Sequence, residues 1–306
     1  MTTHPLAGVY VATITPLYPN YSIDLPAIAP VLDHLARRGC HGALLLGTTG
    51  EGPSFSFPER RDICRAALQI RQAHPGFHLL AGTGTPSLEE TIANTRAVFD
   101  VGLDGVVVLP PYYYRKVTDD GLFAWFAEVI RRAVPADGLL FAYHIPAVSG
   151  VGLSLDLIAR LHDAFPKQFA GLKDSSADLD FATQLGQRFG NDLLIFNGTD
   201  SLAQPALQAG AGGCITALAN LFSPDLRAVW DAHQQGTTAP EAHARLQAAR
   251  AISNRYPPAS ATLKALFSRL NRFPRWPVRP PLVPLSREVE ERVLAELQTA
   301  GLLAEH

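Results

Sequence analysis

Cysteine is scarce in this sequence: the 306 residues include only Cys40, Cys64 and Cys214. The three are odd in number, lie far apart and stand in no CxxC or CxxH pattern. A disulfide framework or a zinc site built from cysteine pairs is therefore disfavoured. We interpret them as reduced thiols and expect a cytoplasmic protein that holds no metal.

An excess of charge of one sign is also missing. Lysine and arginine total 26, aspartate and glutamate total 28, and the net charge is −2. The basic residues are spread along the chain, so we expect neither nucleic acid nor a membrane surface as a partner. No apolar run reaches about 18 residues, the length that a membrane-spanning helix needs. The first residues, MTTHPLAGVYV, show no basic segment followed by an apolar one, so we expect no secretory signal.

What the sequence does contain is a series of short apolar runs separated by longer amphipathic segments. Each run has the length of a buried strand, and a continuous rather than alternating apolar character is typical of parallel sheets. The eight runs cover residues 9–14, 42–47, 78–82, 105–110, 139–144, 169–173, 193–198 and 213–218. Several of the amphipathic segments begin with a residue that caps helices, namely Ser87, Thr118, Ser223 and Ser286.

Eight strands that alternate with helices indicate the α/β class and, within it, a closed (β/α)₈ TIM barrel. The alternative is an open doubly wound sheet, but no GxGxxG follows a predicted strand in the way that fold would require. We expect residues 1–233 to form the catalytic barrel. Residues 234–306 should form a C-terminal helical appendage, with a proline-rich crossing at 273–285 before its last helix.

Active sites of such barrels lie at the carboxyl ends of the strands, so the polar residues that follow each run are the candidates. They are Thr48, Thr49, Tyr113, Tyr143, Lys173, Gly198, Asp200 and Thr216. Lys173, which closes the sixth run, is the most informative of them. Burial disfavours the ammonium form of a lysine, and the neutral amine is the nucleophile that carbonyl chemistry needs.

These residues stand in motifs that extend over most of the chain. The motifs are GTTGE at 47–51, AGTG at 81–84, PPYYY at 110–114, YHIPAVSG at 143–150, GLKDSS at 171–176, FNGTD at 196–200, GCITALAN at 213–220 and RPPLVPLS at 279–286. In this order and spacing they resemble the dihydrodipicolinate synthase/N-acetylneuraminate lyase family of class I pyruvate-dependent aldolases and lyases.

The resemblance implies a role for each matching position. Lys173 corresponds to the lysine that forms a Schiff base with a 2-oxo acid, and Tyr143 to the tyrosine that shuttles protons. Thr48 and Tyr113 correspond to the two residues that link this tyrosine to solvent, with Tyr113 supplied by a neighbouring subunit. Thr49 corresponds to a residue that binds the pyruvate carboxylate through backbone N–H groups. The resemblance further implies that the enzyme needs no cofactor and forms a homotetramer, a dimer of dimers.

Departures from the family pattern bear on the substrate. Members that use aspartate semialdehyde usually carry an arginine two residues after the proline of the tyrosine motif, and here that position is Val148. A bidentate carboxylate clamp is therefore missing at this position. Phe57 and Pro86 stand where enzymes inhibited by lysine commonly have His and Asn. His144 replaces the usual Asn and receives no role from the sequence.

Other members bind sugar acids through two acidic residues after the seventh strand, whereas this chain has Asp200 followed by Ser201. Asp200 and Thr216 would suit a shorter polyol. We therefore expect an aldolase that joins or releases pyruvate and an aldehyde, with a 2-keto-3-deoxy sugar acid as substrate.

The alternatives are 4-hydroxy-tetrahydrodipicolinate synthase, N-acetylneuraminate lyase, and a dehydratase or hydratase-aldolase of the same family. A non-enzymatic binding protein is a further alternative, but the retained Lys173, Tyr143, Thr48 and Tyr113 disfavour it.

Overall fold

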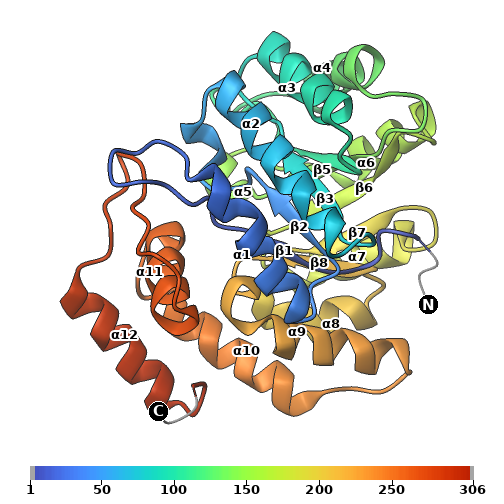
Figure 1. The fold of residues 1–306 in the computed structure, drawn as a ribbon. Helices are drawn as coiled ribbons and strands as arrows, with labels where there is room; N and C mark the ends of the chain where they lie inside the picture. Colours follow the sequence, from blue (N-terminus) through green and yellow to red (C-terminus); the bar gives the residue numbers. More distant parts are fainter. Residues whose placement is uncertain (1–3, 304–306) are drawn as a thin grey trace.

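The computed structural model describes residues 4–303, and its centre is a closed barrel of eight parallel strands (Figure 1). Each strand pairs with the next in the chain, and β8 returns to pair with β1. The strands are β1 (Gly8–Ala12), β2 (Gly42–Leu45), β3 (His78–Gly82), β4 (Gly105–Val108), β5 (Leu140–His144), β6 (Phe169–Asp174), β7 (Leu194–Asn197) and β8 (Gly213–Thr216). The predicted (β/α)₈ barrel is thereby confirmed.

All eight apolar runs become strands, and the largest differences lie at their carboxyl ends. The second run was expected to reach residue 47, but β2 stops at Leu45 because Leu46 takes a left-handed conformation with φ 57°. A residue in that region turns the chain out of the sheet. The strands therefore end early where the loops that carry the candidate residues begin.

Large side chains fill the inside of the barrel. Tyr10, Phe141 and Phe196 are fully buried there, and Phe196 packs edge-on against both other rings. Leu44 and Ile215 belong to the same cluster. The interior is thus a packed core, which leaves the two ends of the barrel as places for a site.

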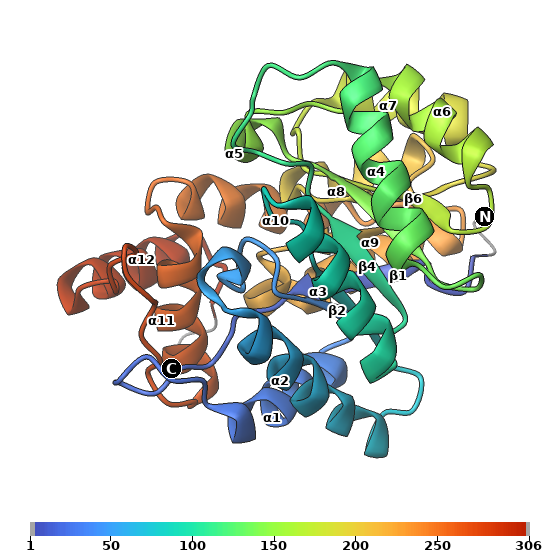
Figure 2. The same ribbon diagram turned by 90° about the horizontal axis from the view of Figure 1, so that it is seen from above.

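Helices surround the barrel and connect its strands (Figure 2). They are α1 (Leu25–Arg37), α2 (Phe57–Ala67), α3 (Leu88–Val101), α4 (Asp119–Ala133), α5 (Pro146–Ser149), α6 (Leu155–Ala164), α7 (Leu179–Phe189), α8 (Ala203–Gln208), α9 (Ala219–Gln234), α10 (Pro240–Ser253), α11 (Ala259–Asn271) and α12 (Arg287–Thr299), with the short 3₁₀ turns η1 (Gly52–Ser54), η2 (Leu68–Gln72) and η3 (Asp200–Leu202). Within residues 4–303, no helix combines the length and the apolar character that a membrane crossing requires.

Three of the four predicted helix caps are confirmed. The side chains of Ser87, Thr118 and Ser286 each accept a hydrogen bond from a backbone N–H of the first turn of α3, α4 and α12. The prediction that Ser223 caps a helix is wrong, because α9 begins at Ala219 and includes it. The backbone leaves helical geometry at Phe222, and Pro224, which has no N–H to continue the hydrogen bonding, accounts for this interruption.

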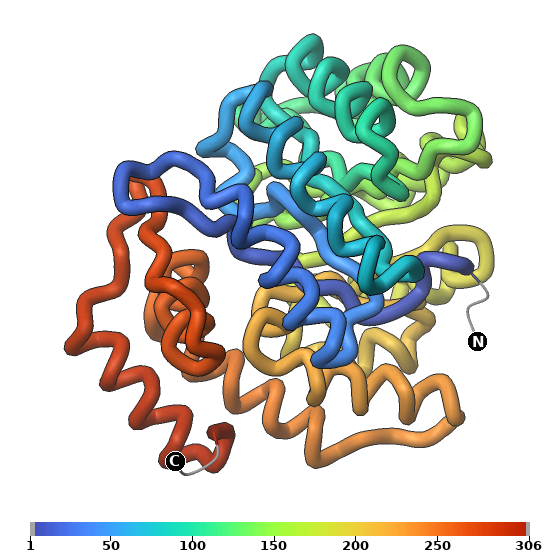
Figure 3. The backbone as a smooth tube through the Cα atoms, in the orientation of Figure 1, coloured from blue at the N-terminus to red at the C-terminus, as the bar shows by residue number. Residues whose placement is uncertain are grey.

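The last three helices pack together on the side of the barrel away from α4, α6 and α7 (Figures 1 and 2). Leu246, Phe267 and Trp276 are buried in the same apolar cluster as the layer between the strands and their helices. The loop around residue 20 and the crossing near residue 280 lie side by side (Figure 3), where Arg279 donates hydrogen bonds to the carbonyl of Tyr21. The boundary at residue 233 stays a prediction.

Candidate active site

Lys173 and Tyr143 form the centre of the site at the carboxyl end of the barrel. They are register partners in the neighbouring strands β6 and β5, so both side chains point to the same face of the sheet. The Nζ of Lys173 donates a hydrogen bond of 3.1 Å to the phenolic oxygen of Tyr143 and lies 4.2 Å from the centre of its ring. Both side chains are buried.

The surroundings of Tyr143 favour its ionised form. Burial raises the pKa of a phenol, but the charge of Lys173 and hydrogen bonds from Lys173, Thr48 and Ser175 outweigh it and lower the pKa of Tyr143 below its usual value. A tyrosine tuned in this way can both accept and return a proton near neutral pH more readily than a free phenol.

Thr48 and Thr49 lie in the turn that follows β2. Two left-handed residues, Leu46 and Glu51, flank this turn, each with φ 57°. Such conformations cost about 1–3 kcal/mol apiece and persist only where the surrounding structure imposes them. This turn also needs glycine at position 52, because a Cβ there would stand 1.9 Å from the carbonyl oxygen of Leu46.

A small cavity of about 30 Å³ lies beside this turn. Thr48, Tyr143 and Arg60 supply its polar lining, and Leu44, Leu46 and Val107 are among its apolar lining. Arg60 is buried and donates to the carbonyls of Gly52, Phe55 and Gly82. The cavity is therefore mostly apolar, with a few polar side chains next to the phenol.

A second cavity, of about 500 Å³, lies at the amino end of β7, between the ends of α7 and α8, and includes His4, Asp192 and His233. It is larger but contains neither lysine nor tyrosine. We place the chemistry at the mouth with Lys173, because carboxyl ends of strands carry the active sites of such barrels.

Ser175 is a site residue that the sequence reasoning missed, although it stands in the GLKDSS motif. Its side chain lies near Tyr143 and helps to lower the pKa of the phenol. Gly198 lies against it: the N–H of Gly198 donates to the carbonyl of Asp174 at 2.6 Å, and a Cβ on Gly198 would stand 1.9 Å from the Ser175 hydroxyl. Gly198 thus leaves room for the hydroxyl of Ser175, and its predicted contact with the substrate stays a prediction.

Tyr113 does not join this group within the single chain. It lies in the loop between β4 and α4 with 75% of its surface exposed, and its ring packs edge-on against that of Tyr114. No hydrogen bond connects it to Tyr143 in the part of the chain that the structure describes. An exposed tyrosine is what the expected contribution to a neighbouring subunit would require, and that contribution stays a prediction.

Asp200 is placed differently from our expectation. Its side chain is fully buried and pairs with Arg250 of α10, with 3.1 Å between Oδ2 and Nη1. Thr216 beside it is also buried. Burial raises the pKa of Asp200, against the lowering effect of Arg250. Its Oδ1 and the Oγ1 of Thr216 have no hydrogen-bond partner among the described residues, and the predicted polyol contact of these two residues stays a prediction.

His144 now has a structural account. Its ring stacks on Phe181 at 4.6 Å, and its Nδ1 accepts a hydrogen bond from the backbone N–H of Leu153. Burial lowers its pKa to about 4, so the imidazole is neutral at physiological pH. His144 is therefore a packing residue behind the site.

Val148 lies on the short helix α5 at the mouth, where 56% of its surface is exposed. Arg115, from the loop before α4, lies against the end of the same helix, because a Cβ on Gly150 would stand 2.7 Å from the Cδ of this arginine. Within residues 4–303, Arg115 forms no ion pair. The mouth of the barrel thus has the apolar Val148 at the position where other family members have an arginine. The cation nearby is Arg115, which comes from a different loop.

Comparison with known proteins identifies the family of this chain. The model of the dihydrodipicolinate synthetase family matches residues 5–300. An uncharacterized DapA-like lyase of Chloroflexus aurantiacus is 41% identical over 285 residues, which cover 92% of each chain. The 4-hydroxy-tetrahydrodipicolinate synthase of Thermus thermophilus is 35% identical over 288 residues, again 92% of each chain.

Solved structures agree as well. The dihydrodipicolinate synthase of Cyanidioschyzon merolae, solved with lysine bound, superposes with a TM-score of 0.89 at 25% identity and covers 98% of this chain and 100% of its own. YagE of Escherichia coli K12, solved with pyruvate, shares the fold with a TM-score of 0.89 at 24% identity, covering 97% and 99%. This chain belongs to the dihydrodipicolinate synthetase family, whose members are class I aldolases and lyases.

Proposed function

We propose that Lys173 forms a Schiff base with pyruvate and that Tyr143 carries the protons of the reaction. The observation that supports this most directly is the 3.1 Å contact between the two side chains. The amine adds to the C2 carbonyl of pyruvate and loses water to give an imine. The protonated imine withdraws electrons from C3, which loses a proton to form an enamine, and C3 then attacks the carbonyl carbon of an aldehyde. Hydrolysis of the product imine returns the amine, and the reverse sequence cleaves the C3–C4 bond.

Four further residues act around this pair in the proposal. Thr48 and Ser175 lie near Tyr143 and lower the pKa of its phenol. Thr49 offers backbone N–H groups to the pyruvate carboxylate, a use that turns serve without a cation. Tyr113, exposed in this chain, completes the relay to solvent from a neighbouring subunit of a homotetramer.

Borohydride reduction in the presence of pyruvate tests the proposal. The chain has four lysines, Lys116, Lys167, Lys173 and Lys264, so the labelled peptide identifies the nucleophile. We expect a reduced pyruvyl group on Lys173 alone and loss of activity in step with labelling. Label on another lysine, or none, would refute the assignment.

For the second substrate we propose a hydroxylated aldehyde, so that the product is a 2-keto-3-deoxy sugar acid. The support is Val148, which stands exposed at the mouth where a carboxylate-bearing aldehyde would need a cation. The second candidate is 4-hydroxy-tetrahydrodipicolinate synthase. Arg115 favours it, because a free guanidinium beside Gly150 could receive the carboxylate of aspartate semialdehyde from a different loop.

Kinetics with pyruvate and either aldehyde separate the two candidates. We expect a higher kcat/KM with glyceraldehyde than with aspartate semialdehyde, and Val148→Arg should narrow the gap. Arg115→Gln serves as the matched test of the alternative. If aspartate semialdehyde is the better substrate and R115Q abolishes that preference, the synthase is the correct assignment and Arg115 is its clamp.

A further inference from the structure

The turn with Thr48 and Thr49 is held from outside the barrel by the C-terminal appendage. Glu51, the last residue of this turn, is buried, and its carboxylate forms an ion pair with Lys264 of α11. Its second oxygen accepts a hydrogen bond of 2.8 Å from the backbone N–H of Arg279. Lys264 is equally buried and also donates to the carbonyl of Pro277 at 2.8 Å.

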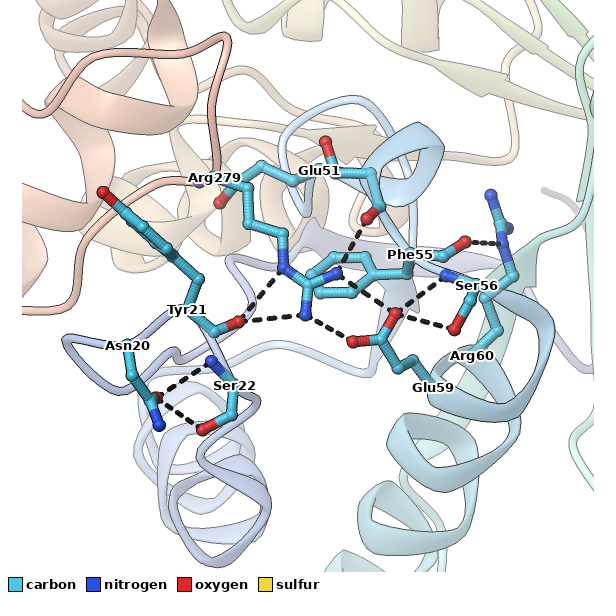
Figure 4. Close-up of polar contacts among 10 residues, drawn as sticks. Asn20, Tyr21, Ser22, Glu51, Phe55, Ser56, Glu59, Arg60 and Arg279 are labelled. Atoms are coloured by element: carbon cyan, nitrogen blue, oxygen red, sulfur yellow. Dashed lines mark hydrogen bonds and ion pairs between the residues drawn. The ribbon is translucent and has the colours of Figure 1, made fainter.

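The side chain of Arg279 extends the same attachment (Figure 4). Its guanidinium donates to the carbonyl of Ser54 at 2.8 Å and pairs with Glu59 at the start of α2. It also donates to the carbonyl of Tyr21 and lies 4.5 Å from the centre of the Phe55 ring. One arginine thus joins the loop at Tyr21 to the segment that follows the turn, residues 54–59.

The contacts of Lys264 and Arg279 can stabilise the conformation of the turn at residues 46–51. Its two left-handed residues, Leu46 and Glu51, need surrounding contacts to keep their conformation. The N–H of Glu51 donates to the carbonyl of Thr48, so a change at Glu51 reaches Thr48 directly. Thr48 in turn lines the same small cavity as Tyr143 and helps to lower the pKa of its phenol.

We propose that Lys264 and Arg279 are positioning residues of the active site, which act through Glu51 and Ser54 to hold Thr48 against Tyr143 and Thr49 beside the substrate carboxylate. The proposal rests on the proposed roles of Lys173 and Tyr143. In this proposal the C-terminal appendage contributes no reacting group but affects the rate of proton transfer by positioning the turn.

The test uses pyruvate alone, so the unknown aldehyde does not enter. Exchange of the C3 hydrogens of pyruvate with D₂O, followed by NMR, reports proton transfer through the enamine. Borohydride labelling at increasing pyruvate concentration reports binding and imine formation. The variants are Arg279→Gln and Lys264→Met. The control is Arg275→Gln, in the same proline-rich segment, which donates to the carbonyl of Leu285 and pairs with Glu290 but does not contact the turn.

We expect R279Q and K264M to slow the exchange roughly 10- to 100-fold, because misplacement by about an ångström has effects of this size. Half-maximal labelling should need more pyruvate. The pH at which exchange is half-maximal should rise, because displacement of Thr48 removes one of the groups that lower the pKa of Tyr143. Arg279→Lys, which keeps the charge with fewer donors, should recover part of the rate, and R275Q should match the wild type.

The outcomes separate the two proposals. A wild-type protein that neither exchanges nor takes label would refute the proposed function itself. If the wild type exchanges and R279Q matches R275Q in rate, pyruvate dependence and pH profile, the positioning role is overturned, whatever happens to the melting temperature. K264M leaves the buried Glu51 carboxylate without an opposite charge and can fail to fold. R279Q therefore decides the question, because the side chain of Arg279 is partly exposed.

Discussion

The amine of Lys173 points at the oxygen of Tyr143 across 3.1 Å because β6 and β5 pair these two residues in register. Neither residue depends on a flexible loop for its place. A one-residue slip of either strand would turn its side chain out of the barrel. The backbone ladder therefore sets the geometry of the nucleophile and the proton carrier together, and the loops adjust only the groups around them.

Replacing the phenol tests the proton carrier separately from the nucleophile. Tyr143→Phe should keep the fold and the borohydride labelling of Lys173 but lower turnover roughly 10²- to 10⁴-fold, the usual effect of a positioned acid or base. Tyr10→Phe is the matched control, since Tyr10 is also buried inside the barrel and its hydroxyl has no partner among residues 4–303. A Y143F enzyme as fast as Y10F would remove Tyr143 from the relay.

Ser175 offers a finer test of how Tyr143 is tuned. Its hydroxyl helps to lower the pKa of the phenol, so Ser175→Ala should raise that pKa. The rising limb of the pH–rate profile, where phenolate is needed, should then move to higher pH. Ser176→Ala is the control, because the hydroxyl of Ser176 accepts a hydrogen bond from the N–H of Asp178 instead. Superimposable profiles for both variants would show that Ser175 does not act on Tyr143.

The strands were predictable because a parallel sheet covered on both faces needs continuous apolar runs, as 42–47 and 105–110 show. Lys173 and Tyr143 were identified through their motifs, and the register of two strands brings them together. The partners of Glu51 and Asp200 could not be predicted. Glu51 pairs with Lys264 and Asp200 with Arg250, residues far along the chain on helices whose sequence pattern fixes a buried face but not a specific contact.

The contact between Glu59 and Arg279 should appear in the pH dependence of stability. Hydrogen bonding to Arg279 is the main cause that lowers the pKa of Glu59 from 4.5 to about 2. The carboxylate therefore stabilises the fold above pH 4.5, and this contribution is lost as the pH falls from 4.5 towards 2. Glu59→Gln should lower the free energy of unfolding at pH 7 by about 1–2 kcal/mol, since partial exposure screens the pair.

Urea unfolding at several pH values checks this expectation. The difference between wild type and E59Q should shrink below pH 4.5 and vanish near pH 2. Glu288→Gln is the control, because Glu288 pairs with Arg292 on the exposed face of α12 and its loss should change little at any pH. A constant difference between E59Q and wild type across this range would mean that packing, and not charge, accounts for it.

For the pair of Asp200 and Arg250 we expect a larger loss of stability than for an exposed pair, because the carboxylate is completely buried. Arg250→Met leaves that charge without a partner and should lower the free energy of unfolding by about 3–5 kcal/mol at pH 7.

Burial already raises the pKa of Asp200, and the variant loses the arginine that opposes this rise. Relative to the wild type, its destabilisation should therefore grow once the pH passes the raised pKa of Asp200 in the folded wild type, where the wild type releases the proton and the variant keeps it, and become small at or below pH 3.8. Asp200→Asn combined with R250M should recover most of the loss, and Arg188→Met, which breaks an exposed pair with Asp156, should cost less than about 1 kcal/mol. Chemical unfolding of the four proteins at pH 3.5 and 7 decides the matter: an R250M protein as stable as the wild type at pH 7 would show that Asp200 needs no cation.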